Sequence, residues 1–435
     1  MIRVTRSRWA LAAAALAGTA VLLAGCLESR LAFSPDGKHL AAVTAEALNE
    51  DGRGVAGSHS YKLIVFRDRK TPDVLAETAE AILSAPAWSP DGNRLAVVRI
   101  ALPTEAELDA IQDRAAARGK KLAALRRDDG LYWSQVLTDP EAPLGDGNQP
   151  ETRTKDQTLP NLSATALMFN HMLKVPPAEA YLEILDAKTG KPLSRTRVHM
   201  PHLEAFTAYS RVRPQFAPDG REVYVTTGWS LVAVHPVLKR QKTLAAPIHQ
   251  AYLRADGGQA AVIQDQTLCL LDLQTPRAVY LPCSICGDGA AAAWLDANTV
   301  AVAPKQPELA EGNVAEVDIL LFTAEGRSAG KRTLELTGPT SGFGAELAAA
   351  GDGSRLALTY GPEMWLLDGD GKTVAHMAPP ETFTLSSPVF APDGKTLAVR
   401  RTAKLGENDF RTAEVLFYSI DGKPSGSLKM PAAGQ

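Results

Sequence analysis

The sequence has few cysteines and few aromatic residues, and neither sign of charge dominates it. Among 435 residues there are 4 cysteines, 6% aromatic residues and a formal net charge of −3 at pH 7. This near balance of charge gives no indication of a nucleic-acid partner. By contrast, 34 glycines and 29 prolines predict frequent turns, and 45% hydrophobic residues are typical of a folded globular protein.

Motifs of catalysis and of cofactor binding are missing as well. The sequence contains no Gly-x-Ser-x-Gly nucleophile elbow and no glycine-rich phosphate loop. His199 and His202 form an H-x-x-H pair, but a metal site needs further ligands. The other candidates, His171 and His249, lie far from that pair in the sequence. We therefore predict no catalytic residue, no metal ligand and no cofactor, and we interpret these histidines as surface or loop residues.

The first 25 residues have the pattern of a targeting segment. Three arginines, Arg3, Arg6 and Arg8, precede an apolar, alanine-rich run at 9–24, which is typical of a secretory signal peptide. The run ends in Leu-Ala-Gly-Cys at 23–26, which resembles the bacterial lipobox. That resemblance implies cleavage after residue 25 and acylation of Cys26, which would hold the chain on a membrane.

An uncleaved signal anchor is the alternative interpretation, although the apolar run is short for a spanning helix of about 20 residues. Cleavage would remove three arginines and no acidic residue, leaving 410 residues with 43 basic and 49 acidic side chains and a net charge of −6. Leu27 and Glu28 follow the cysteine, and by resemblance to Gram-negative sorting rules the missing aspartate favours the outer membrane. A chain of this length predicts several domains or one repeat architecture.

One short phrase recurs along the chain. It begins at Phe33 as FSPDGKHLAAV and returns at Trp88, Phe216 and Phe390 as WSPDGNRLAVV, FAPDGREVYVT and FAPDGKTLAVR. Proline presets the backbone for a turn, aspartate bonds to its own backbone, and glycine accepts the left-handed conformation that closes a hairpin. The phrase therefore predicts a strand, a tight turn and a second strand.

Weaker copies bring the number of such turns to seven. Their aspartates are Asp36, Asp91, Asp219, Asp256, Asp296, Asp352 and Asp393. Three of the intervals between successive aspartates lie near the 40 to 45 residues of a propeller blade. Each copy is followed by a third apolar strand and usually by a fourth. We predict an all-β fold, a seven-bladed β-propeller of four-stranded antiparallel blades. A β-sandwich, or two all-β domains with coincidental turns, is the alternative.

The Ser-Pro-Asp-Gly phrases at 34–37 and 89–92 resemble the WD-repeat-like motif of TolB-type propellers, which also occurs in the propellers of prolyl oligopeptidase-like enzymes. The resemblance covers about residues 31–430 and implies the fold, not a function. The sequence departs from TolB because no α/β domain precedes the first blade. It departs from the oligopeptidases because the seven repeats leave no room for a hydrolase domain.

A segment foreign to the repeat, at 101–179, interrupts the second blade. Thr104 and Glu107 form a capping box, and apolar residues at helical spacing follow, so we expect a partly helical insertion. Its first helical region is basic, which would suit anionic lipid headgroups or a partner, although a solvated helix face is the plainer interpretation. We expect the insertion to pack on one face of the disc as a lid or flange.

The remaining three cysteines lie close together in the sequence. Cys283 and Cys286 form a C-x-x-C, and a hairpin around 274–277 would place Cys269 opposite Pro282 or Cys283. A structural disulfide, either within the C-x-x-C or to Cys269, is the expected state in an oxidising compartment. A redox role would need a lowered thiol pKa, for which no thioredoxin-like context is present.

These observations predict a signal peptide at 1–25, a short lipidated linker at 26–30 and a propeller over 31–435. We expect a non-catalytic lipoprotein of the cell envelope, facing the periplasm from the outer membrane in a Gram-negative cell. The propeller would serve as a platform for an envelope protein, with no nucleic-acid partner. The alternative is a propeller enzyme or ligand-binding protein, of hydrolase or lyase type, with a site at the central channel, because loops of several blades can build a site that no linear motif reveals.

Overall fold

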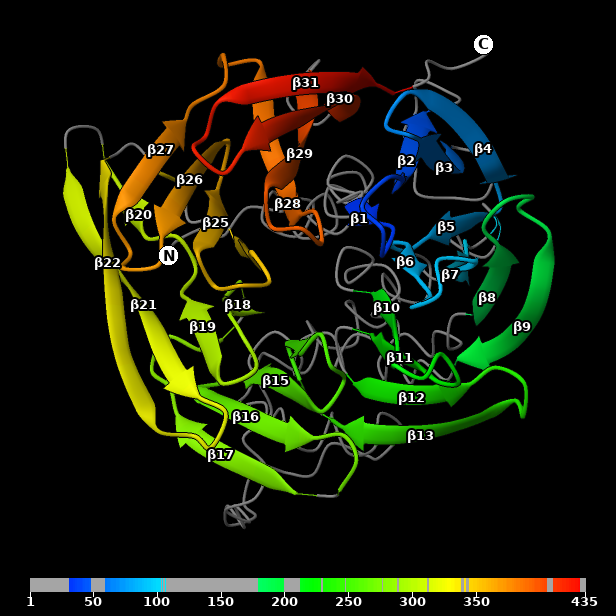
Figure 1. Cartoon of the computed structure of the whole chain (residues 1–435), viewed down its shortest axis with the longest axis horizontal. Coiled ribbons are helices and arrows are strands. Elements are labelled where there is room, and N and C mark those ends of the chain that lie inside the picture. Colours follow the sequence, from blue (N-terminus) through cyan, green and yellow to red (C-terminus); the bar gives the residue numbers. More distant parts are fainter. Residues whose placement is uncertain are drawn as a thin grey trace, which may run out of the picture.

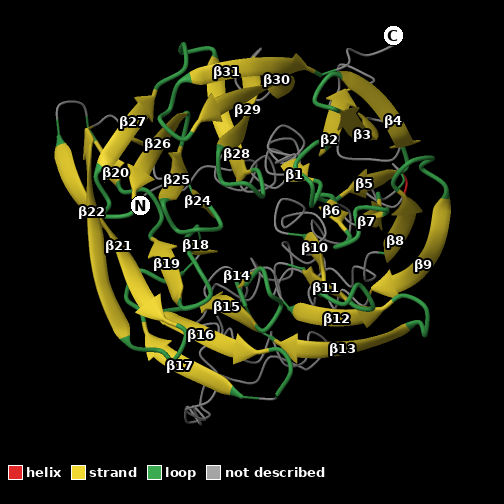
Figure 2. Cartoon of the chain, viewed as in Figure 1, coloured by secondary structure: helices red, strands yellow, loops and turns green. Residues whose placement is uncertain are grey.

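The strands of the protein form a closed ring of radial sheets. The computed structural model describes residues 31–47, 59–102, 104, 106, 179–198, 212–227, 230–246, 248–275, 277–287, 289–310, 313–337, 340–341, 344–404 and 410–430. Seven antiparallel sheets stand around a common centre, as Figure 1 shows, and the described residues are almost entirely strands and turns (Figure 2). The prediction of a seven-bladed β-propeller is therefore confirmed.

The first three blades follow one another along the chain. Blade 1 comprises β1 (Leu31–Phe33), β2 (Leu40–Ala47), β3 (His59–Arg67) and β4 (Thr71–Thr78). In blade 2 the innermost strand is split into β5 (Ala81–Leu83) and β6 (Ala87–Trp88), which both pair with β7 (Arg94–Ala101), and then come β8 (Ala180–Asp186) and β9 (Pro192–Val198). Blade 3 comprises β10 (Arg213–Phe216), β11 (Val223–Thr226), β12 (Leu231–His235) and β13 (Arg240–Ala245).

The other four blades continue around the ring. Blade 4 comprises β14 (Gln250–Leu253), β15 (Gln259–Gln264), β16 (Thr267–Asp272) and β17 (Ala278–Pro282). Blade 5 comprises β18 (Ala291–Trp294), β19 (Thr299–Ala303), β21 (Val314–Thr323) and β22 (Ser328–Thr337). Blade 6 comprises β24 (Ala345–Ala349), β25 (Arg355–Tyr360), β26 (Glu363–Asp368) and β27 (Thr373–Met377). Blade 7 comprises β28 (Phe383–Phe390), β29 (Thr396–Lys404), β30 (Phe410–Ser419) and β31 (Pro424–Lys429).

The apolar pattern of each strand follows from its place in the blade. The second and third strands are packed on both faces by neighbouring blades, so they read as continuous apolar runs; β11 is buried at all of its residues. The outermost strands face solvent, and β13 is exposed at Arg240 to Thr243. The cores therefore lie between blades; one cluster, for example, joins Leu182 and Ile184 of blade 2 to Val223 and Val232 of blade 3.

Blade 7 meets blade 1 without sharing a strand. All four strands of blade 7 come from 383–429 and all four of blade 1 from 31–78. The joint is a packed cluster in which the rings of Phe33 and Phe417 lie 6.5 Å apart between centroids. The ring thus closes through side-chain packing between two complete sheets.

The ring has two unlike faces, which we name by their connections. The turn face carries the inner turns, which join first to second strands (34–39, 89–93, 217–222, 254–258, 295–298, 350–354 and 391–395), and the outer turns, which join third to fourth strands (68–70, 187–191, 236–239, 273–277, 324–327, 369–372 and 420–423). The insertion face carries the connections from second to third strands and from blade to blade. The connection from Ala101 at the end of β7 to Ala180 at the start of β8 belongs to this face, so the predicted insertion starts and ends on the insertion face. Its predicted helical content lies outside the described residues.

The other long connections also belong to the insertion face. They join β2 to β3, β9 to β10, β19 to β21, β22 to β24 and β29 to β30. Two of them meet in a small extra sheet, where β20 (Glu308–Leu309) pairs with β23 (Thr340–Ser341). Within the described part of the chain, no helix is both long enough and apolar enough to cross a bilayer.

Candidate functional site

In every inner turn the predicted aspartate accepts a hydrogen bond from the backbone amide two residues further on. In blade 1 the Gly37 amide donates to the Ser34 carbonyl at 2.8 Å, and Gly37 has a φ of +70°. The Asp36 carboxylate accepts from the Ser34 hydroxyl at 2.6 Å and from the Lys38 amide at 3.1 Å. The Ser34 hydroxyl bond, with the Lys38 amide, lowers the pKa of Asp36 below its ordinary value. The repeated aspartate is therefore a structural residue of the turn.

The inner turns also interlock from one blade to the next. A Cβ atom added at Gly257 of blade 4 would lie 2.3 Å from Cδ of Pro218 in blade 3, so only glycine fits there. Other inner-turn glycines lie against the proline of the preceding blade less tightly, with a Cβ at 3.5–3.8 Å from the proline ring: Gly37 on Pro392, Gly92 on Pro35 and Gly220 on Pro90. The Pro-Asp-Gly phrase thus recurs because its two ends contact each other across blades, including the joint between blades 7 and 1.

The outer turns form a second contact circle. A Cβ added at Gly190 of blade 2 would lie 2.4 Å from the backbone oxygen of Leu75 in blade 1. Equivalent approaches to the fourth strand of the preceding blade occur at Gly326 on Val279, Gly371 on Arg332 and Gly422 on Ala375. Glycines of both circles of turns are therefore held close against the neighbouring blade.

An arginine bridges every pair of adjacent blades. Three donate to a backbone oxygen of the next blade: Arg67 to Lys188 at 2.8 Å, Arg254 to Ala297 at 2.8 Å and Arg355 to Ile420 at 2.9 Å. Arg332 bridges blades 5 and 6 by donating to the Gly369 oxygen. The remaining joints use an arginine over an aromatic ring: Arg94 on Phe216 at 5.4 Å, Arg213 on Tyr252 at 5.2 Å and Arg69 on Phe417 at 5.8 Å.

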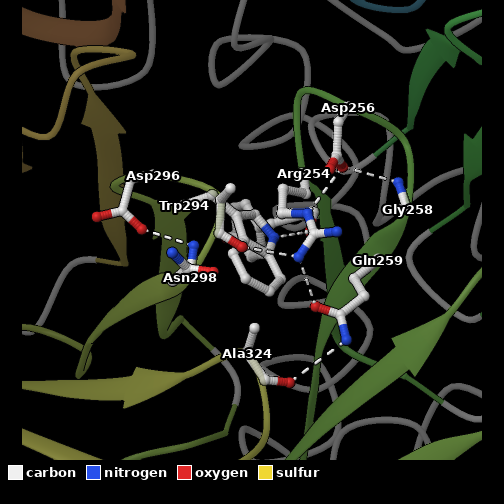
Figure 3. Close-up of polar contacts among 10 residues, drawn as sticks. Arg254, Asp256, Gly258, Gln259, Trp294, Asp296, Asn298 and Ala324 are labelled. Atoms are coloured by element: carbon white, nitrogen blue, oxygen red, sulfur yellow. Dashed lines mark hydrogen bonds and ion pairs between the residues drawn. The ribbon is translucent and has the colours of Figure 1, made fainter.

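Figure 3 shows the joint between blades 4 and 5. The Arg254 guanidinium donates to Asp256 at 2.7 Å and to the Gln259 side chain at 2.9 Å within its own blade, and to the Ala297 carbonyl in the next. It lies 5.4 Å from the ring centroid of Trp294. Because its charge is shared among these acceptors and the ring face, Arg254 fixes the distance between the two turns.

Tryptophan at the phrase position adds a direct bond to the preceding blade. The Trp294 indole donates to the Tyr252 carbonyl at 2.9 Å, and the Trp88 indole donates to the Ala32 carbonyl at 2.9 Å. Neither the tryptophans nor the bridging arginines were identified as functional from the sequence. Their roles concern assembly of the ring, so these contacts of the turn face are structural.

The inner edge of blades 6 and 7 carries a partly buried carboxylate. Glu346 on β24 accepts from the Thr359 hydroxyl at 3.2 Å and from the backbone amide of Ser387 on β28. Ser387 is buried and has a φ of +54°, a backbone conformation that costs about 1–3 kcal/mol for a residue other than glycine. These contacts join the innermost strands of two blades, and no motif predicted them because the residues are far apart in the sequence.

On the insertion face, His249 is buried and contacts the carboxylate of Asp265, which is half-exposed. His171, His199 and His202 lie outside the described residues. Within the described ranges, no group of three or more histidine, cysteine, aspartate or glutamate side chains is arranged to hold a metal ion. The predicted lid and most of the connections that would complete this face also lie outside those ranges.

Cys269 lies within β16 of blade 4, and Cys283 and Cys286 lie in the loop that follows β17. Cys283 and Cys286 are joined by a disulfide, in a loop tied to the β15–β16 turn by two backbone bonds of 2.9 Å with Gln266. The expectation that Cys269 lies opposite Pro282 or Cys283 is wrong, because the hairpin turns one residue earlier and pairs Cys269 with Tyr280. Cys269 is a buried thiol whose pKa burial raises to about 11, so it is a poor nucleophile. Cys26 lies outside the described residues.

Comparison with known proteins gives likeness of fold alone. No protein-family model matches the sequence, and no curated protein matches it either. A solved structure of hydrazine synthase from Kuenenia stuttgartiensis is similar, with a TM-score of 0.48 and 14% identity, covering 88% of this chain and 95% of that one. A prolyl endopeptidase structure has a TM-score of 0.49 and 12% identity, covering 98% of this chain and 54% of that one. The Cps50 (Swd1) propeller domain of Myceliophteria thermophila has a TM-score of 0.41 and 13% identity, covering 58% and 81%.

Proposed function

We propose that this protein is a TolB-like propeller of a bacterial envelope, anchored by an acylated Cys26, that presents its insertion face to a protein partner without catalysing a reaction. The observation that carries the proposal is the asymmetry of the ring. The turn face carries the close contacts between blades, whereas every long connection, including the interruption of blade 2, belongs to the insertion face. Segments carried by a rigid scaffold are where binding residues concentrate.

Membrane anchoring is supported by the sequence around Cys26, which lies a few residues before the first strand at Leu31. An extended chain spans at most about 3.6 Å per residue, so this linker would keep the start of β1 within about 20 Å of the lipid. Growth with radiolabelled palmitate tests the anchor. We expect label on the wild-type chain and none on Cys26→Ala; label on both, or on neither, would contradict it.

Partner binding is tested by affinity capture from detergent-solubilised membranes. The comparison is between the intact chain and a variant in which a short glycine-containing turn replaces residues 103–178. We expect a defined protein to be captured by the intact chain and lost with the variant, while Arg277→Met, an exposed change on the turn face, retains it. Equal capture by all three chains would contradict the assignment to the insertion face.

The alternative, a propeller enzyme or ligand-binding protein, has one specific observation in its favour. Glu346 and Ser387 place a carboxylate and a strained serine together at the inner edge of the ring. Their contacts also serve to join blades 6 and 7, so the platform is the better-supported function. A small-molecule ligand lost on Glu346→Gln, with the ring still folded, would reverse this ranking.

A further inference from the structure

We propose that the outer rim of blades 2 and 3 docks on an anionic lipid surface. The site, here called the basic rim patch, combines exposed lysines and arginines with exposed aliphatic side chains. Its members are Lys188, Lys191, Leu193, Arg195 and Arg197 of blade 2, and Val237, Leu238, Lys239, Arg240 and Lys242 of blade 3. The proposed function enters this argument at one point only: the acylated anchor would bring the protein to a membrane. The charge and exposure of the patch are observed independently of that anchor.

The aliphatic part of the patch is the tip of the β12–β13 hairpin. Val237 is 79% exposed and Leu238 is 55% exposed, and they are adjacent in the turn. Among the described residues, Val237 is the most exposed of the large hydrophobic side chains. A convex turn that holds two aliphatic side chains in solvent has the form of an element that enters the boundary between headgroups and acyl chains.

Basic residues surround that tip on both sides. Lys239, Arg240 and Lys242 follow it directly, and no acidic residue occurs at 231–246. On the neighbouring blade, Leu193, Arg195 and Arg197 alternate along β9 with all three exposed. The hairpin lies beside the end of β9 in Figure 1, and the Thr196 hydroxyl donates to the Pro236 carbonyl at 3.2 Å. The two halves therefore form one surface.

The charge is concentrated at this part of the rim. Residues 187–198 carry four basic and no acidic side chains, and residues 231–246 carry three lysines or arginines and no acidic side chain. The same part of blade 1, residues 68–78, carries two basic and three acidic side chains. In blade 6, residues 369–377 carry one of each. Because the whole chain has a net charge of −3, the patch is a local feature and not a consequence of composition.

Lipid suits this surface better than an acidic protein does. Protein interfaces are commonly anchored by aromatic side chains that fill pockets of the partner, and none of the ten patch residues is aromatic. Among the described residues, Lys239, Arg240 and Lys242 have no acidic ion-pair partner, so their charges remain available to headgroups. Arg195 is partly engaged, because it lies 3.5 Å from Glu183 and over the Tyr181 ring.

The test is sedimentation with vesicles, using residues 27–435 without the acylation site. This chain keeps every strand of the ring, since all of them lie within 31–430. We expect binding to vesicles of phosphatidylglycerol and phosphatidylcholine but not of phosphatidylcholine alone. Raising the salt from about 0.1 M to about 1 M shortens the Debye length from ~10 to ~3 Å and should release the protein.

Variants separate the two parts of the patch. Lys239→Gln with Lys242→Gln should weaken binding about 25-fold, at about fivefold for each charge near a membrane. Val237→Ser with Leu238→Ser should weaken binding while leaving its salt dependence unchanged. The matched control is Lys372→Gln with Lys423→Gln, which removes two exposed lysines from other outer turns and should have no effect.

Three outcomes would overturn the proposal. The first is equal binding to charged and uncharged vesicles, and the second is an equal loss of binding in the Lys372→Gln, Lys423→Gln control. The third is binding to soluble polyglutamate with none to either vesicle, which would indicate that the partner is an acidic protein. Because this chain lacks Cys26, failure here leaves the acylation result untouched. All the substitutions are at exposed positions, and thermal unfolding verifies that each variant is folded.

Discussion

The turn face and the insertion face of the ring are built in opposite ways. On the turn face, short connections of nearly constant length place glycine, proline and arginine in contact with the next blade. On the insertion face, connections differ widely in length from blade to blade, and the longest leaves blade 2 between Ala101 and Ala180. Close packing thus limits the side chains that fit on the turn face, whereas the insertion face accommodates connections of very different length.

The largest effect is expected at an outer turn. Gly190→Ala forces an L side chain into a backbone with φ of +71° and places its Cβ 2.4 Å from the Leu75 oxygen. We expect a loss of about 3–4 kcal/mol in the free energy of unfolding, from backbone strain together with overpacking. Chemical denaturation measures it. Gly92→Ala, with φ of +71° but its nearest neighbour at 3.7 Å, should lose only about 1 kcal/mol. Equal losses in the two variants would show that the close contact of Gly190 with blade 1 does not contribute to stability.

A bridging arginine should contribute less than a glycine contact. Arg254→Met keeps the aliphatic stem but removes the bonds to Asp256, Gln259 and the Ala297 carbonyl. We expect a loss of about 2 kcal/mol, measured by the same denaturation. Arg277→Met, at an exposed position of the same blade, is the control and should change little. A similar loss from both would mean that the bridge adds nothing.

The turn aspartates should make stability depend on pH below the neutral range. The Ser89 hydroxyl holds the pKa of Asp91 below its ordinary value of 3.8. A carboxyl with a lowered pKa in the folded state stabilises the protein above its unfolded pKa, and that stability disappears as the pH falls through the folded value. Ser89→Ala should therefore cost about 1 kcal/mol at pH 7 and less below about pH 4. If the loss of unfolding free energy stayed constant down to pH 2, Ser89 would not act through the charge of Asp91.

The smallest effect on stability is expected on the insertion face. Replacing residues 103–178 by a short turn leaves the pairing of β7 with β8 intact, from Arg94 opposite Asp186 to Ile100 opposite Ala180. Because loop-closure entropy varies slowly with loop length, we expect the free energy of unfolding to change by about 1 kcal/mol at most. Unfolding followed by tryptophan fluorescence measures it. A loss as large as that of Gly190→Ala would place the replaced segment within the core of the ring.

The fold could be predicted because one turn chemistry recurs. Proline, aspartate and glycine at fixed spacing specify a hairpin in four of the repeats, the aspartate recurs in all seven, and seven such hairpins specify a ring. The contacts that hold the ring could not be predicted, because they join residues of different blades. Arg67, Arg254 and Arg355 occupy different places in their repeats. Only the three-dimensional arrangement shows that each donates to a backbone oxygen of the next blade.

The candidate sites were predictable to a smaller extent. The place of the interruption in blade 2 followed from the repeat, since its second and third strands are recognisable on either side. The pairing of Cys269 was missed by a one-residue error in the hairpin turn, which moves its partner from Pro282 to Tyr280. The Val237–Leu238 tip was not identified, because an apolar pair beside lysines looks like an ordinary strand end until its exposure is known.

The joint between blades 7 and 1 has a consequence for how the protein is made. Since neither blade borrows a strand from the other end of the chain, the first sheet has all of its hydrogen-bonded partners once residue 78 has been synthesised. Each blade can therefore pair its strands in the order in which they emerge. Closure of the ring then requires only the docking of two finished surfaces around Phe33 and Phe417.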